Sequence, residues 1–98
     1  MILVRNVFRI KFGTAKQAKE LWREGLAIQK KLGFENGRIL TDITGPFYTL
    51  VFEITFKSLS DLEQSMKTMM GTKEWGEWYQ KFVPLVESGY REIFTIVE

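Results

Sequence analysis

Two long segments of the chain alternate between apolar and polar side chains. In residues 2–12 (ILVRNVFRIKF), the even-numbered positions are apolar except for Asn6. In residues 47–57 (FYTLVFEITFK), the even-numbered positions are apolar without exception. A period of two residues is that of a β-strand, so the sequence predicts two strands, each with one continuous apolar face.

Two further strands are predicted from turn signals and from weaker alternation. Residues 38–44 follow an Asn-Gly pair, and a Gly-Pro turn separates them from residues 47–57, which predicts an antiparallel hairpin. Residues 90–97 alternate again after Ser88-Gly89, and we expect the last strand there.

Helices are predicted in the two intervals between these strands. Apolar residues recur every three or four positions over 15–32, and Thr14 with Gln17 has the pattern of a capping box. A second capping box, Ser60 with Glu63, predicts a helix to about Met70. After Gly71, a further helical segment begins near Thr72 and is limited by Pro84.

The predicted order is β-α-β-β-α-β, with no repeat or linker. This is the ferredoxin-like pattern of the α+β class, in which helices cover one face of an antiparallel sheet. Residues 1–98 are therefore interpreted as a single domain.

The opposite face of the predicted sheet mixes large apolar side chains with charged ones. A second copy of the chain often covers such a face through two-fold symmetry, and its charges then need partners within or between subunits. We therefore expect a homodimer, with a dimer face that includes Arg5, Val7, Arg9, Phe47, Val51 and Glu53.

Composition excludes several kinds of chemistry. The chain has no Cys and no His, so disulfides, thiol nucleophiles, His-ligated metals and His-dependent catalysis are ruled out. A net charge of +2 gives no general attraction to nucleic acid or to acidic membranes. No apolar run is long enough to span a bilayer, and the first residues do not have the pattern of a signal peptide, so a cytoplasmic location is expected.

The element order, the position of Asn6 and the segment 74–93 (EWGEWYQKFVPLVESGYREI) resemble dimeric α/β-barrel proteins. NIPSNAP-like domains and domains of the antibiotic-biosynthesis-monooxygenase type are the most similar groups. The resemblance implies a homodimer in which two sheets form a barrel, with a ligand cavity between helices and sheet in each subunit. In the monooxygenase and haem-degrading branches, a first-strand Asn and a helix Trp line that cavity. Haem-degrading members use a His as iron ligand, which this chain lacks.

Asn6 is the one polar side chain on an apolar strand face, which makes it the candidate catalytic residue, although a structural hydrogen bond would explain it equally well. The predicted ligand pocket contains Asn6, Trp22, Tyr48, Met66, Trp75, Trp78 and Tyr79, although aromatic side chains at helical spacing also form ordinary cores. No cofactor and no metal site are predicted. We expect a small hydrophobic or aromatic ligand, and neither nucleic acid nor membrane as a partner.

The sequence leaves open whether the protein is an enzyme. The first hypothesis is a NIPSNAP-like domain that binds a small molecule, and the alternative is a cofactor-independent monooxygenase acting on a small aromatic or enolisable substrate. RNA binding is disfavoured because the open face of the first strand has no stacking ring. An acylphosphatase-like activity is disfavoured because Gly13-Thr14 is too short to cradle a phosphate.

Overall fold

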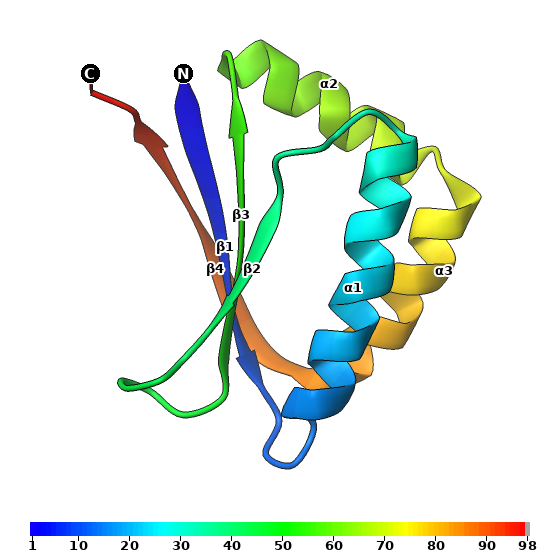
Figure 1. The fold of residues 1–98 in the computed structure, drawn as a ribbon. Helices are drawn as coiled ribbons and strands as arrows, with labels where there is room; N and C mark the ends of the chain where they lie inside the picture. Colours follow the sequence, from blue (N-terminus) through cyan, green and yellow to red (C-terminus); the bar gives the residue numbers. More distant parts are fainter. Residues whose placement is uncertain (98) are drawn as a thin grey trace.

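A computed structural model describes residues 1–97, which form one antiparallel sheet with the helices packed against a single face (Figure 1). The strand order is β2-β3-β1-β4. The elements are β1 (Ile2–Ile10), α1 (Ala15–Lys31), β2 (Arg38–Thr41), β3 (Thr49–Phe56), α2 (Leu59–Met70), α3 (Lys73–Phe82), a 3₁₀ turn (Val83–Leu85) and β4 (Val86–Thr95). The predicted ferredoxin-like α+β fold is therefore confirmed.

The hydrophobic core lies between the helices and the inner face of the two central strands. Even-numbered residues of β1 and β3 point to this core, as the alternation predicts, and Val4 and Leu50 are almost fully buried. The α1 and α3 helices approach closely at Gly25, where an added Cβ would lie 2.8 Å from the ring of Trp78. The indole N–H of Trp78 donates to the carbonyl oxygen of Leu21, so a hydrogen bond as well as packing joins the two helices.

The first three strands are shorter than predicted. β1 ends at Ile10, and the next backbone N–H, that of Lys11, donates to the carbonyl of Leu85 in the 3₁₀ turn. Tyr48 has a positive φ of 58°, which interrupts the extended backbone, and β3 begins one residue later. Asp42 closes the hairpin loop, because its carboxylate accepts from the backbone N–H of Thr49 at 2.9 Å.

The last strand starts four residues earlier than predicted. Ser88-Gly89 was interpreted as a break, but both residues lie within β4. A Cβ at Gly89 would lie 3.0 Å from the carbonyl oxygen of Val7 and 3.1 Å from the ring of Phe8. Gly89 is therefore a strand residue that leaves room for Phe8 on the neighbouring strand.

Both predicted capping boxes were wrong in detail. The hydroxyl of Thr14 donates to the carbonyl of Lys11 and does not cap α1. The α2 helix is capped by Ser58, whose hydroxyl oxygen accepts from the N–H of Asp61 at 3.2 Å. Ser58 has the extended backbone that an N-cap requires, whereas Ser60 already lies inside the helix.

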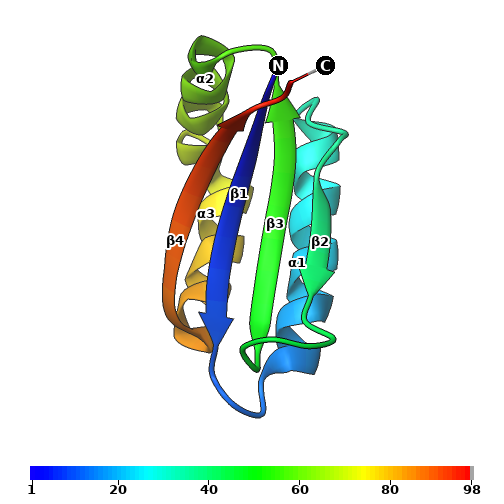
Figure 2. The ribbon, with the colours of Figure 1, turned by 90° about the vertical axis from the view of Figure 1, so that its left-hand side faces the viewer.

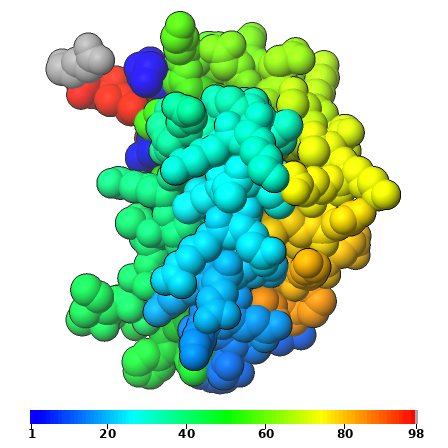
Figure 3. Space-filling view, turned by 45° about the vertical axis from the view of Figure 1, so that its right-hand side comes forward, coloured from blue at the N-terminus to red at the C-terminus, as the bar shows by residue number. Residues whose placement is uncertain are grey.

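The loop between β2 and β3 projects beyond the body of the molecule, on the side of the sheet away from the helices (Figures 1 and 3). Its residue Ile43 is 97% exposed. Among the described residues, no helix has the length and apolar character needed to cross a membrane.

Candidate functional site: a cavity between sheet and helices

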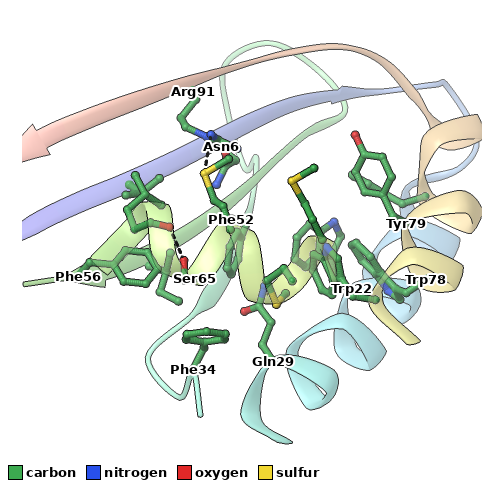
Figure 4. A pocket seen from close by; sticks show the side chains of 18 of the residues that line it. Asn6, Trp22, Gln29, Phe34, Phe52, Phe56, Ser65, Trp78, Tyr79 and Arg91 are labelled. Atoms are coloured by element: carbon green, nitrogen blue, oxygen red, sulfur yellow. Dashed lines mark hydrogen bonds between the residues drawn. The ribbon is translucent and has the colours of Figure 1, made fainter. Parts of the chain in front are cut away.

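A cavity of about 200 Å³ lies between the inner face of the sheet and the helices. We call it the Asn6 cavity. Side chains from α1, α2, α3 and all strands except β2 surround it (Figure 4). Its most polar lining residues are Asn6, Gln29, Ser65, Tyr79 and Arg91, and the rest of the lining is mainly aromatic rings, aliphatic side chains and methionines.

Trp22 is the centre of the aromatic wall. Its ring stacks on Phe52 of β3 at 4.8 Å between centroids, and it meets Trp78 of α3 edge-on at 4.5 Å. Trp75 stacks on Trp78 in turn at 4.4 Å. The wall is thus built from a strand and two helices that are far apart in sequence, and its rings fix one another in place.

Asn6 and Arg91 form the polar part of the cavity on the sheet side (Figure 4). They are direct cross-strand neighbours on β1 and β4. The Nε–H of Arg91 donates to Oδ1 of Asn6 at 2.7 Å, and its Nη1 group lies 3.7 Å from the thioether sulfur of Met66. Asn6 is therefore held by a charged side chain, and both face the same space.

Two side chains from α1 line the other side of the cavity, and each has a polar atom that solvent does not reach. Trp22 and Gln29 are 3% and 4% exposed, yet Trp22 Nε1 and Gln29 Oε1 have no hydrogen-bond partner among the described residues. Figure 4 shows both side chains across the cavity from Asn6 and Arg91. Neither atom is reached by solvent, so both lie beneath the surface of the cavity, and an unsatisfied buried polar group of this kind costs about 1–3 kcal/mol.

The cavity opens to solvent between α2, α3 and β4. The exposed members of its lining are Met66, Met70, Tyr79 and Arg91, and Met70 is 84% exposed. Methionine side chains are flexible and polarizable, so this rim can adapt to ligands of different shape.

Six of the seven predicted pocket residues line the Asn6 cavity: Asn6, Trp22, Met66, Trp75, Trp78 and Tyr79. Tyr48 does not. Its positive φ takes it out of the alternation, its ring packs edge-on against Phe12, and it lines a separate depression near the start of α1. The prediction that Tyr48 belongs to this pocket was therefore wrong.

The sequence analysis missed Arg91 and Gln29 as pocket residues. Gln29 was visible as the polar member of an otherwise apolar helix face, which is the same signal that singled out Asn6. Arg91 carries no such signal, because β4 is an exposed edge strand and only its register with β1 places Arg91 beside Asn6.

The lining offers hydrogen bonding and one positive charge, and little acid–base chemistry. It contains no carboxylate, and its one phenol is that of Tyr79. Residues 1–97 hold no group of three or more acidic side chains arranged to bind a metal ion. The lining thus presents hydrogen-bonding groups and one cation, without a carboxylate.

The outer face of the sheet, which Figure 2 presents to the viewer, carries a row of alternating charges across all four strands. In sheet order the row is Arg38, Glu53, Arg5 and Glu92. Glu53 accepts from Arg5 and from Arg38 at 2.8 Å each, and Arg5 also reaches Glu92 at 3.2 Å. These charges are paired within one chain.

Glu53 is the buried member of this row, at 5% exposed. Burial on its own would raise the pKa of its carboxyl, but the hydrogen bonds from Arg38 and Arg5 and their positive charges outweigh it, and the pKa lies below its ordinary value.

An apolar row runs beside the charged one. The register places Leu40, Val51, Val7 and Tyr90 next to one another in sheet order. Val7 and Val51 are already buried between their neighbours, while Tyr90 is 60% exposed. Of the other predicted dimer-face residues, Arg9 donates to the carbonyl of Phe47 at 3.2 Å, and Phe47 lies in the exposed β2–β3 loop rather than in a strand.

Comparison with solved structures places this geometry among known folds, whereas no family model and no curated protein matches the sequence. A NIPSNAP family protein from Agrobacterium tumefaciens superimposes with a TM-score of 0.91 at 22% identity, over 99% of this chain and 93% of that one. An uncharacterized NIPSNAP domain protein from Burkholderia xenovorans gives 0.86 at 17% identity, over 99% and 95%.

An antibiotic biosynthesis monooxygenase also shares the fold. It superimposes with a TM-score of 0.77 at 15% identity, and the match covers 100% of both chains. At these identities the likeness concerns the fold and not the chemistry. The chain therefore has the fold that NIPSNAP family proteins share with antibiotic biosynthesis monooxygenases, as the sequence resemblance predicted.

Proposed function

We propose that this protein binds a small, mainly apolar molecule in the Asn6 cavity. The observation that carries the proposal is a cavity of about 200 Å³ with a mainly aromatic and aliphatic lining, into which Asn6 and Arg91 bring hydrogen-bonding groups from one side. Concave, apolar sites with a few convergent polar groups are typical of ligand pockets. A volume of about 200 Å³ suits a compound of one or two rings.

We also propose that the protein acts as a homodimer through the outer face of the sheet. The support is the apolar row, whose end members Leu40 and Tyr90 are 37% and 60% exposed, together with exposed Phe94 on the same face. Two-fold symmetry would place this row against its own copy, and the neighbouring charges already have partners within the chain.

A second candidate function is cofactor-independent oxygenation of an aromatic or enolisable compound. Asn6 and the indole of Trp22 both line the cavity, as this alternative requires. The lining supplies no carboxylate or imidazole, so the substrate would have to lose its proton without a basic side chain. Binding is therefore the function that the geometry supports best.

Calorimetric titration with p-cresol tests the binding proposal, because this probe has one ring and one hydroxyl group. We expect saturable binding that Ser65→Phe abolishes, since buried Ser65 lines the cavity and a phenyl ring there would fill it. Ser60→Phe, on the exposed side of α2, is the matched control and should bind normally. Absence of saturable binding to the wild type, with no retained small molecule in native mass spectrometry, would contradict the proposal.

Sedimentation velocity tests the dimer. We expect about twice the chain mass of 11.5 kDa for the wild type, and a shift toward the monomer for Leu40→Lys combined with Tyr90→Lys. Leu59→Lys, at an exposed site at the start of α2, is the control and should leave the mass unchanged. A monomeric wild type at micromolar concentration would refute the assembly.

A further inference from the structure

Arg91 has no carboxylate partner within residues 1–97, in contrast to Arg5 and Arg38 on the outer face. Arg5 and Arg38 both pair with Glu53. The partners of Arg91 are neutral: the amide oxygen of Asn6 and the thioether of Met66. A thioether is a weak acceptor, so most of the hydrogen-bonding capacity of this guanidinium is unused.

Asn6 orients the unused part of Arg91. It takes the Nε–H at 2.7 Å, which leaves the terminal nitrogens to face the cavity and its rim. A guanidinium held in this way can donate two parallel hydrogen bonds to a carboxylate, the geometry in which arginine binds anions most strongly. Arg91 lies at the exposed rim, so water competes with such a pair and the two-bond geometry supplies its specificity.

Arg91 is also the one cationic residue of the lining. A single guanidinium matches a monoanion, and it leaves any second negative charge on a ligand without a partner in an aromatic cavity. Di- and triphosphates and dicarboxylates are therefore poor matches for this site.

The other lining residues indicate the shape and polarity of the rest of the ligand. Between Arg91 on the sheet side and Gln29 and Trp22 on the helix side, the walls are the rings of the aromatic wall (Figure 4). A flat, apolar body suits that space.

We propose that the ligand of the Asn6 cavity is a small aromatic acid, whose carboxylate pairs with Arg91 and whose ring lies against the aromatic wall. This inference rests on the proposed binding function and deepens it, since it assigns the charge and polarity of the ligand to named residues.

Three related probes test it by calorimetry. 4-Hydroxycinnamate carries both groups, 4-hydroxycinnamamide lacks the charge, and cinnamate lacks the hydroxyl. We expect the wild type to bind 4-hydroxycinnamate at least about 10-fold more tightly than the amide, because a charge-assisted hydrogen bond is replaced by a neutral one. We expect cinnamate to bind about as tightly as 4-hydroxycinnamate, since both present the same ring and the same carboxylate.

Variants assign the effect to Arg91. Arg91→Gln should lose the preference for the carboxylate over the amide, and Arg91→Lys should keep part of it. Arg23→Gln removes the same charge from an exposed position of α1 and should leave the preference unchanged.

Two results would overturn the inference. If acid and amide bind the wild type equally, or if Arg91→Gln keeps the full preference, Arg91 does not recognise a carboxylate. If p-cresol binds in either case, the cavity still binds small molecules and the error concerns the charge alone. If neither p-cresol nor any of the three probes binds, the proposed function fails as well.

Discussion

Asn6 and Arg91 lie 85 positions apart in the sequence, yet they are opposite residues on β1 and β4 and share a 2.7 Å hydrogen bond. The bond joins a half-buried strand residue to a cation on an exposed edge strand. It thereby gives an apolar cavity one oriented positive group, and the proposed ligand chemistry depends on this orientation.

Asn6→Ala tests the orienting role. Without the amide oxygen, the Arg91 side chain gains rotameric freedom, and we expect the affinity for 4-hydroxycinnamate to fall by about 3- to 10-fold. The affinity for neutral p-cresol should change little. Asn36→Ala is the control, because Asn36 bonds to Thr55 outside the cavity. Equal losses for both ligands, measured by calorimetry, would show that Asn6 shapes the cavity without orienting the charge.

The close approach of α1 and α3 predicts opposite effects for two glycines. Gly25→Ala would place a methyl group 2.8 Å from the ring of Trp78, which is held by its bond to Leu21, so the variant should lose about 1–3 kcal/mol of unfolding free energy. Gly76→Ala meets no atom within 4 Å and should gain up to about 1 kcal/mol from helix propensity. Urea denaturation measures both, and a stabilised Gly25→Ala would show that the ring can move aside.

Glu53→Gln should destabilise the protein by about 1–3 kcal/mol at pH 7, because Gln keeps the shape of the side chain but not the charge that Arg5 and Arg38 require. Glu74→Gln is the control. Its pair with Lys31 is exposed and 3.4 Å long, so removing it should have little effect. Chemical denaturation of each variant at pH 7 gives the comparison.

The stability difference between wild type and Glu53→Gln should depend on pH in one direction. The pKa of Glu53 is lower in the folded protein than its ordinary value of 4.5, so the unfolded chain binds the proton more readily. The stabilisation is complete well above pH 4.5 and is lost as the pH falls through the folded pKa. The stability gap between wild type and Glu53→Gln should therefore narrow in acid, and a gap that widens below pH 4.5 would contradict the assignment.

The cap of α2 can be assigned by two alanine variants. Ser58→Ala removes the acceptor for the N–H of Asp61 and should cost about 1 kcal/mol. Ser60→Ala changes an exposed residue inside the helix and should stay within about 0.5 kcal/mol of wild type. Thermal unfolding followed by circular dichroism compares them, and a larger loss for Ser60→Ala would restore the capping box predicted from the sequence.

Local periodicity was enough to predict the order of the elements, the buried faces of β1 and β3 and six residues of the cavity lining. Asn6, Trp22 and Trp78 could be selected because a period of two or of 3.6 residues assigns each side chain to a face. The core forms where these faces meet, so the buried faces can be predicted from the sequence alone.

The tertiary structure decided which residues meet across the sheet. Tyr48 was placed wrongly because one positive φ ends the alternation, and β4 was cut short because Gly89 resembles a turn until Phe8 is seen packed over it. Arg91 reaches Asn6 through strand register, which depends on hydrogen bonds between segments far apart in the chain. A periodic pattern predicts the face of an element on which a residue lies, but not the residue that lies beside it on the next strand. The positive charge of this cavity comes from such a cross-strand neighbour, Arg91.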